Sequence, residues 1–266
     1  MPDNRFGGLT TALEPVMREA GELARETSRR PYKRWTKGDD DSPVTEGDIA
    51  VNELLRARLS ALIGEAGWLS EESEDVPEPA LPLVWVVDPI DGTRAYIAGR
   101  ADWSISVALV ERGRPVAAAL FAPASDEMFL ATRGEGSTLN RIPIATSRGE
   151  TLASAKLAGP KRYLEQFTLL EASIQGQPRV PSLALRLARV AQGELDAAFA
   201  SPGSHDWDVA AADLLVHEAG GLLTDLAGKP LRYDNPQVAH GALMAAGGAR
   251  HRMLVDLVRN CRGEFA

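Results

Sequence analysis

The sequence predicts a mixed fold with an α+β first half and an α/β second half, and three patterns support this. Two helical segments with apolar residues on one face open the chain. Apolar strands follow in close succession, and helices alternate with strands from about residue 146 onward. A chain of 266 residues is long enough for one large domain or two joined ones. We therefore expect an N-terminal α+β domain over residues 1–145 and a C-terminal α/β domain over residues 146–266.

The residue composition is that of a globular protein. Hydrophobic residues make up 44% of the chain and charged residues 25%, which excludes bulk disorder. The net charge of −8 argues against nonspecific binding to nucleic acid or to anionic membranes, so we expect neither as a partner. The single cysteine, Cys261, excludes an internal disulfide and a cysteine-rich zinc site. The chain shows no apolar run typical of a signal peptide or membrane span, so we expect a cytoplasmic protein.

The N-terminal helices are predicted by the spacing of their apolar residues. From Leu9 to Arg29, apolar residues recur at intervals of three and four, and Pro31 is expected to end this helix. Residues 31–47 are polar and rich in turn-forming residues, so they predict a loop long enough to be functional. A second helical pattern opens at Asp48 and continues to Leu62.

The strands of the first half follow an acidic segment, WLSEESED. The apolar run LVWVVD predicts a buried strand, and PIDGTRAYIAG predicts a turn followed by a short helix. Two alternating strands, WSISVALV and VAAALFAP, come next. The segment from EMFLAT to RIPI then predicts a further meander.

The second half alternates between the two element types. Strands are predicted at KLAGP, LDAAFA, GLLTD and LMAAGG. Helices are predicted near YLEQFTLLEA, from Ser182 to Gln192, over WDVAAADLLVHEAGG with its glycine stop, and over HRMLVDLVRN.

The most informative residues for function follow the buried strand. Asp88 stands at its C-terminal end, and Asp91, Gly92 and Thr93 come just after Pro89. Two carboxylates this close repel each other unless a cation bridges them, and oxygen ligands without His or Cys suit Mg²⁺. Gly92 allows close approach of the backbone, and the N–H groups that open a short helix at Thr93 favour a phosphate. The pattern therefore predicts a metal beside a phosphate.

A purely structural interpretation of these carboxylates is also possible. DPIDGT alone can form a tight turn capped by an aspartate, and Asp208 in WDVAAAD can be the N-cap of its helix. The acidic segment SEES, with Glu71 and Glu72, adds further carboxylates and favours the metal interpretation for the set as a whole.

Four segments together resemble the inositol monophosphatase family of Mg²⁺-dependent, lithium-sensitive phosphatases. They are SPVTEGD around Asp48, SEES at 70–73, WVVDPIDGT at 85–93 and WDVAAADLLVHEAGG at 207–221. Their order and spacing fit the family over nearly the whole chain. The resemblance implies a layered α-β-α-β-α sandwich and a homodimer.

The resemblance also implies a ligand set for two or three Mg²⁺ ions. Glu71, Asp88 and the backbone carbonyl of Ile90 would hold the first ion, and Asp88, Asp91 and Asp208 the second. A weaker third ion would rest on Glu71 and water.

The implied reaction is direct attack of a metal-activated water on a small phosphorylated metabolite. Thr93, hydrogen-bonded to Asp48 and sharing the water with Glu71, would orient and deprotonate it. The substrate contacts implied are Asp91, Gly92, Thr93, Lys37, Ser182 and Asp208. For Lys37, and for the aspartates at 39–41, a solvated loop charge is the alternative.

The substrate stays open because the family hydrolyses several phosphomonoesters with one metal core. An inositol-1-phosphate-like substrate is expected first, although Ser201 replaces the glutamate that inositol-selective members carry. A 3'(2'),5'-bisphosphate nucleotidase and a histidinol phosphatase are alternatives, and Lys161 and Arg162 could contact a second phosphate or be surface cations. The alternative outside enzymes is a binding or regulatory protein of the transcription machinery.

Overall fold

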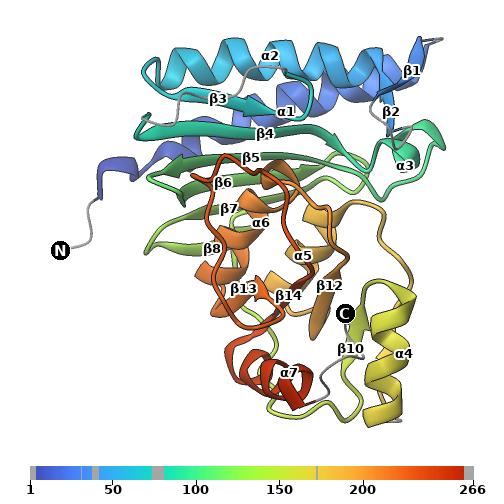
Figure 1. Cartoon of the computed structure of the whole chain (residues 1–266). Helices are drawn as coiled ribbons and strands as arrows, with labels where there is room; N and C mark the ends of the chain where they lie inside the picture. Colours follow the sequence, from blue (N-terminus) through green and yellow to red (C-terminus); the bar gives the residue numbers. More distant parts are fainter. Residues whose placement is uncertain (1–3, 31, 38–41, 74–80, 172, 261–266) are drawn as a thin grey trace.

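Five layers, helix and sheet in turn, make up the chain in this computed structural model (Figure 1). The structure describes residues 4–30, 32–37, 42–73, 81–171 and 173–260. Pro31, the aspartates at 39–41 and Cys261, for which the sequence made predictions, lie outside the described residues.

The larger sheet has seven strands, of which the apolar run after residue 82 forms the second. In sheet order they are β3 (Gly67–Ser70), β4 (Leu83–Asp91), β5 (Ser104–Glu111), β6 (Arg114–Ala122), β7 (Glu127–Thr132), β8 (Gly136–Leu139) and β9 (Ile142–Ile144). β3 and β4 are parallel, and the other neighbouring pairs are antiparallel. Trp85 and Val87 pack into the cluster on one face and Val86 into the cluster on the other, which explains why the run is continuously apolar.

Two antiparallel helices cover the first face of this sheet: α1 (Leu9–Ser28) and α2 (Glu46–Leu62). Leu13 and Met17 are fully buried against it, as the apolar spacing predicts. The second helix begins two residues earlier than expected, because Thr45 is its N-cap and forms a capping box with Asp48.

The second half of the chain supplies the remaining layers. Its five-stranded sheet contains β11 (Gln175–Gly176), β10 (Lys156–Ala158), β12 (Ala197–Ala200), β14 (Leu243–Gly247) and β13 (Gly221–Asp225). Between the two sheets lie α5 (Leu183–Ala191) and α6 (Asp206–Glu218), and on the outer face lie α4 (Lys161–Leu170) and α7 (Gly248–Asn260). The expected α-β-α-β-α sandwich is therefore confirmed.

Alternating side chains of the small sheet separate two cores. Ala198 and Ala245 face the helices between the sheets, and Phe199 and Met244 face the outer helices. Small side chains on the inner face let α5 lie close to β12 and β14.

Short polar strands are the main difference from expectation. The predicted loop at 31–47 contains a hairpin of β1 (Arg34–Lys37) and β2 (Ser42–Thr45), in which Trp35 pairs with Val44. The acidic segment begins as strand β3, and a 3₁₀ turn precedes α1 at Asn4–Phe6. Strands of only four residues are too short to show a clear periodicity.

The proposed boundary near residue 146 stays a prediction. The large sheet ends at Ile144 and the small sheet begins at Lys156, but one buried cluster contains Val86 and Leu120 of the first half with Leu185 and Leu215 of the second. Separately, none of the helices among the described residues is both long and apolar enough to cross a membrane.

Candidate active site

The site is built at the end of β4, where the strand pairing is irregular. Asp88 pairs with Ser106 of β5 and Asp91 with Ser104, so three steps along β4 match two steps along β5. In a regular strand, residues three apart point to opposite faces. The extra residue of this bulge turns both carboxylates toward the face covered by α5 and α6. Ile90 lies in the bulge, and its N–H donates to Asp88 Oδ1 at 3.0 Å.

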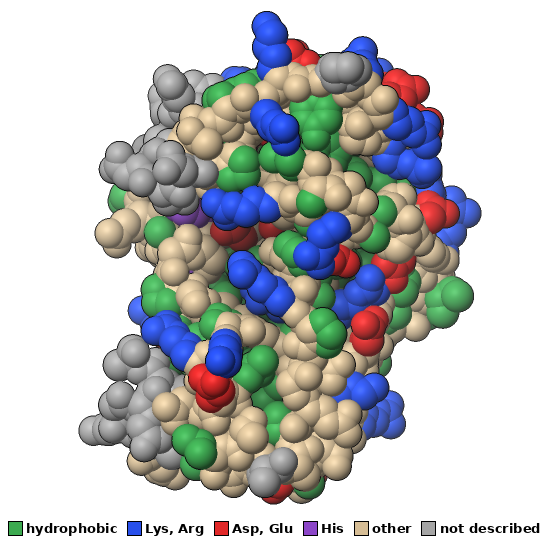
Figure 2. All heavy atoms as spheres, turned by 90° about the vertical axis from the view of Figure 1, so that its right-hand side faces the viewer, with side chains coloured by type: hydrophobic (Ala, Val, Ile, Leu, Met, Phe, Trp, Pro, Cys, Tyr) green, Lys and Arg blue, Asp and Glu red, His purple; other side chains and the backbone are tan. Residues whose placement is uncertain are grey.

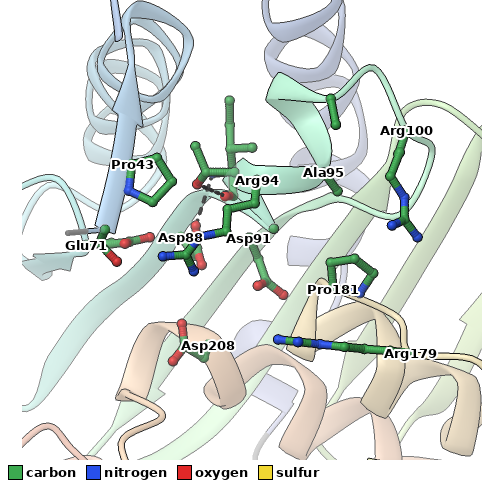
Figure 3. A pocket seen from close by; sticks show the side chains of 15 residues that line it. Pro43, Glu71, Asp88, Asp91, Arg94, Ala95, Arg100, Arg179, Pro181 and Asp208 are labelled. Atoms are coloured by element: carbon green, nitrogen blue, oxygen red, sulfur yellow. Dashed lines mark hydrogen bonds between the residues drawn. The ribbon is translucent and has the colours of Figure 1, made fainter. Parts of the chain in front are cut away.

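Asp208 reaches the same place from the first turn of α6. Its Oδ2 accepts a 2.6 Å hydrogen bond from the backbone N–H of His205, which is the N-cap of the helix. Asp208 is therefore not the N-cap itself but the N3 residue of a capping box. Ligand oxygens of Asp88, Asp91 and Asp208 all lie within 4.8 Å of one another. Figure 3 shows the three carboxylates converging from β4 and α6 on one space.

Asp91 is held by the start of α5. Its Oδ2 accepts hydrogen bonds of 2.6 Å from the Ser182 hydroxyl and 2.6 Å from the Ala184 N–H. Ser182 is fully buried, and its hydroxyl also lies 2.9 Å from that of Ser104. Ser182 therefore supports the Asp91 carboxylate from a buried position. Its role as a substrate contact stays a prediction.

Thr93 and Gly92 line the same cavity, and Asp48 lies next to Thr93. The Thr93 hydroxyl is 3.0 Å from the Ile90 carbonyl and 3.4 Å from Asp48 Oδ1. Asp48 Oδ2 is in turn held by the N–H and hydroxyl of Thr45, at 2.8 and 2.6 Å. Gly92 precedes the short helix α3 (Thr93–Ile97) with φ of +94°, a conformation that favours glycine.

Glu71 lines the same cavity but stands apart from the three aspartates, beside Lys37. The Lys37 ammonium lies 3.3 Å from Glu71 Oε1 and 2.5 Å from Glu72 Oε1, and it donates to the Glu71 carbonyl at 2.9 Å. Burial disfavours the charged form of Lys37. The attraction of the two carboxylates is the stronger effect, so the pKa of Lys37 is raised. Lys37 is therefore a half-buried, paired cation at the acidic cluster rather than a solvated loop charge.

The electrostatics of the cluster favour a bound cation. Burial, with repulsion from the neighbouring carboxylates, raises the pKa of Asp88 and Asp208 well above the usual range. Burial raises the pKa of Asp91 to about 6, although its hydrogen bonds oppose this, and raises that of Asp48 to about 7. A divalent cation would relieve this repulsion. The donors are oxygens alone, which fits a hard ion such as Mg²⁺.

The cavity beside the carboxylates has a volume of about 440 Å³. Figure 2 shows it as a hollow with acidic side chains inside and Lys and Arg side chains around it. The charged lining residues that were not predicted from the sequence are Arg94, Arg100 and Arg179. Arg94 directly follows Thr93 in the motif, so the sequence could have identified it as a site residue. Arg100 and Arg179 lie in no motif that would have indicated a place in the site.

Several residues weighed for substrate binding lie elsewhere. Lys161 pairs with Glu165 at 3.3 Å on α4, and the Arg162 guanidinium lies over the Tyr163 ring. Neither lines the cavity, and neither does Ser201, which is exposed.

Comparisons with known proteins agree with this geometry. The family model described as "Inositol monophosphatase family" matches residues 8–262. An inositol-1-monophosphatase of Rhizobium meliloti is 32% identical over 235 residues, covering 84% of this chain and 88% of that protein. A protein named Nus factor SuhB from Pseudomonas aeruginosa is 35% identical over 229 residues, covering 79% and 83%. The solved inositol monophosphatase of Anabaena superposes with a TM-score of 0.81 at 26% identity, covering 96% and 97%.

Replacing Gly92 by alanine should destabilise the fold more than the same change at Gly99. Both glycines have positive φ, at +94° and +65°, so each variant meets backbone strain of about 1 kcal/mol. A Cβ on Gly92 would also lie 3.1 Å from the Asp102 carbonyl and 3.2 Å from the Ser182 nitrogen, whereas Gly99 has open space. We expect a total loss of about 3 kcal/mol for Gly92→Ala. Denaturant unfolding measures both, and equal losses would contradict the close approach.

Proposed function

We propose that this chain, which belongs to the inositol monophosphatase family, is a Mg²⁺-dependent hydrolase of small phosphomonoesters. The observation that carries the proposal is the convergence of Asp88, Asp91 and Asp208 within 4.8 Å beside a cavity of about 440 Å³. A capping role alone, at position N3 of α6, would explain Asp208. It would not explain why the bulge in β4 turns two further carboxylates toward it.

The ligands proposed for the metal are those that the family resemblance implies. Asp88 would contribute to both principal ions, with Glu71 and the Ile90 carbonyl at one and Asp91 and Asp208 at the other, and a third ion would rest on Glu71. Bound there, the ions would lower the pKa of a coordinated water and offset the charge of the phosphate.

The side chains of Thr93, Asp48 and Glu71 would handle the proton of that water. The Thr93 hydroxyl would orient the water together with Glu71, and Asp48 would accept a proton through Thr93. A pKa raised to about 7 by burial suits Asp48 to this exchange near neutral pH. The 3.4 Å separation between Thr93 and Asp48 is of the kind that shortens when substrate binds.

The substrate contacts proposed are the backbone at Gly92, the Thr93 hydroxyl and the Lys37 ammonium, together with Asp91 and Asp208 through the metal. An inositol-1-phosphate-like metabolite remains the first substrate to test, with a bisphosphate nucleotide and histidinol phosphate as alternatives. We also propose that the chain forms a homodimer.

A role in a transcription complex is a second candidate, favoured by the relative named Nus factor SuhB. Such a role does not need catalytic metal ligands. It therefore predicts an interaction with the transcription machinery that survives replacement of Asp88 by asparagine, whereas hydrolysis does not.

A phosphate-release panel tests the proposed function. The substrates are inositol-1-phosphate, 3'-phosphoadenosine 5'-phosphate, histidinol phosphate and fructose-1,6-bisphosphate, each with Mg²⁺ and then with Li⁺ added. We expect Mg²⁺-dependent release from at least one of them and inhibition by Li⁺. Release no faster than without protein, across the panel, would remove the hydrolase proposal.

Replacing Asp88 by asparagine should abolish turnover through loss of metal. Wild-type protein should gain about 3 kcal/mol of stability at a Mg²⁺ concentration 100 times the Kd, and the variant should gain almost none. Without metal the variant should be at least as stable as wild type, because one buried like charge is gone. Thermal unfolding with and without Mg²⁺ measures this. Asp256→Asn on the exposed face of α7 is the control, and Mg²⁺ stabilisation retained in Asp88→Asn would contradict the assignment.

Replacing Thr93 by alanine should lower kcat by roughly 100-fold, because a positioned proton-transfer partner is lost. Thr93→Ser keeps the hydroxyl and should retain most of the rate. Steady-state kinetics on the best substrate of the panel measures both. A normal kcat in Thr93→Ala would remove Thr93 from the mechanism.

A further inference from the structure

Three arginines surround the mouth of the cavity that holds the carboxylates. Arg94 lies in the first turn of α3, Arg100 follows that helix, and Arg179 precedes α5. All three are exposed residues that line the cavity. In Figure 3 the side chains of Arg94 and Arg179 extend toward the carboxylates from different sides of the space.

Two of these arginines have no counter-ion within the part of the chain that the structure describes. Arg100 pairs with Asp102 at 2.5 Å, but the side chains of Arg94 and Arg179 form no ion pair or hydrogen bond with any described residue. Some exposed arginines elsewhere in this acidic chain pair with carboxylates, such as Arg58 with Glu19 at 2.6 Å. The guanidinium groups of Arg94 and Arg179 have no such partner among the described residues, and both are available to a ligand at the cavity mouth.

The carboxylates of the cavity are not the groups that balance the positive charge of Arg94 and Arg179. The proposed divalent ions would neutralise the four carboxylates, and the same ions would contact the phosphate that is hydrolysed. A cavity of about 440 Å³ has room for much more than a phosphate group. Guanidinium groups bind carboxylates and phosphates through paired hydrogen bonds, so the remaining charge of Arg94 and Arg179 fits a second anionic group on the same substrate.

We propose that Arg94 and Arg179 select phosphomonoesters that carry a second anionic group, which these two guanidinium groups bind at the cavity mouth while the metal ligands hold the phosphate that is cleaved. This inference rests on the proposed hydrolase function. The sequence analysis considered Lys161 and Arg162 as contacts for a second phosphate. We assign that role instead to Arg94 and Arg179, which line the cavity.

Matched substrates that differ by one phosphate test the proposal. Adenosine 3'-monophosphate is compared with 3'-phosphoadenosine 5'-phosphate, and fructose 1-phosphate with fructose-1,6-bisphosphate. In at least one pair, wild-type protein should show a kcat/KM about tenfold or more higher for the member with two phosphates. Arg94→Ala and Arg179→Ala should each remove most of that preference by raising KM, and each should change kcat/KM for the monophosphates less than about threefold.

The control is Arg252→Ala, which removes one positive charge from the exposed face of α7. It should leave the preference unchanged. A wild-type preference for the monophosphates, or a preference that survives both cavity variants, would overturn the proposal. Equal losses on both members of a pair would also overturn it, because the arginines would then serve the phosphate that is cleaved.

Binding measurements separate this inference from the proposed function. If wild-type protein hydrolyses none of the four compounds, titration calorimetry of the same pairs in Mg²⁺ still reports the preference. Tighter binding of the bisphosphates that is lost in Arg94→Ala and Arg179→Ala would support the second-anion site while the hydrolase proposal fails. Equal binding of mono- and bisphosphates would contradict the site itself.

Discussion

Repulsion among buried carboxylates is the constraint on which the rest of the site depends. Asp88, Asp91 and Asp208 are brought within 4.8 Å of one another. Asp88 and Asp91 are buried and Asp208 is partly buried, so water screens their repulsion less than it would at the surface. Each is fixed by a backbone N–H group, at Ile90, Ala184 and His205 respectively. These hydrogen bonds oppose the tendency of the carboxylates to turn apart. The cluster can therefore keep a geometry that suits a divalent cation before one binds.

The layered fold supplies those fixing groups from distant parts of the chain. The helices α5 and α6 lie between two sheets, and the first turn of each faces the end of β4. A helix covered on both sides cannot easily tilt or slide, because its close-packed neighbours would have to move as well. Buried contacts such as Leu185 and Leu215 against the large sheet thus position the site as directly as its polar groups do.

The long elements and the acidic motifs could be predicted from the sequence, whereas the details of the pairing could not. Amphipathic spacing located the helices, and the apolar run ending at Asp88 located the central strand. The bulge depends on pairing with Ser104 and Ser106, and nothing within β4 itself reveals which partner residues it meets. The position of Arg179 likewise depends on how the segment before α5 passes the cavity, which is a tertiary contact between residues far apart in sequence.

The distribution of charge across the cavity explains how anionic and cationic groups coexist there. The aspartates lie deep and the arginines lie at the surface, and neither Arg94 nor Arg179 forms an ion pair with the cluster among the described residues. If a guanidinium did reach Asp91 or Asp208, it would compete with a metal ion for the same oxygens. Lys37 is an example of a side chain that would compete with a metal ion, because its ammonium group contacts the carboxylates of Glu71 and Glu72. Cations must therefore enter the deep positions before an anionic substrate can gain from both the metal and the arginines. The affinity for substrate should accordingly depend on how fully the metal positions are occupied.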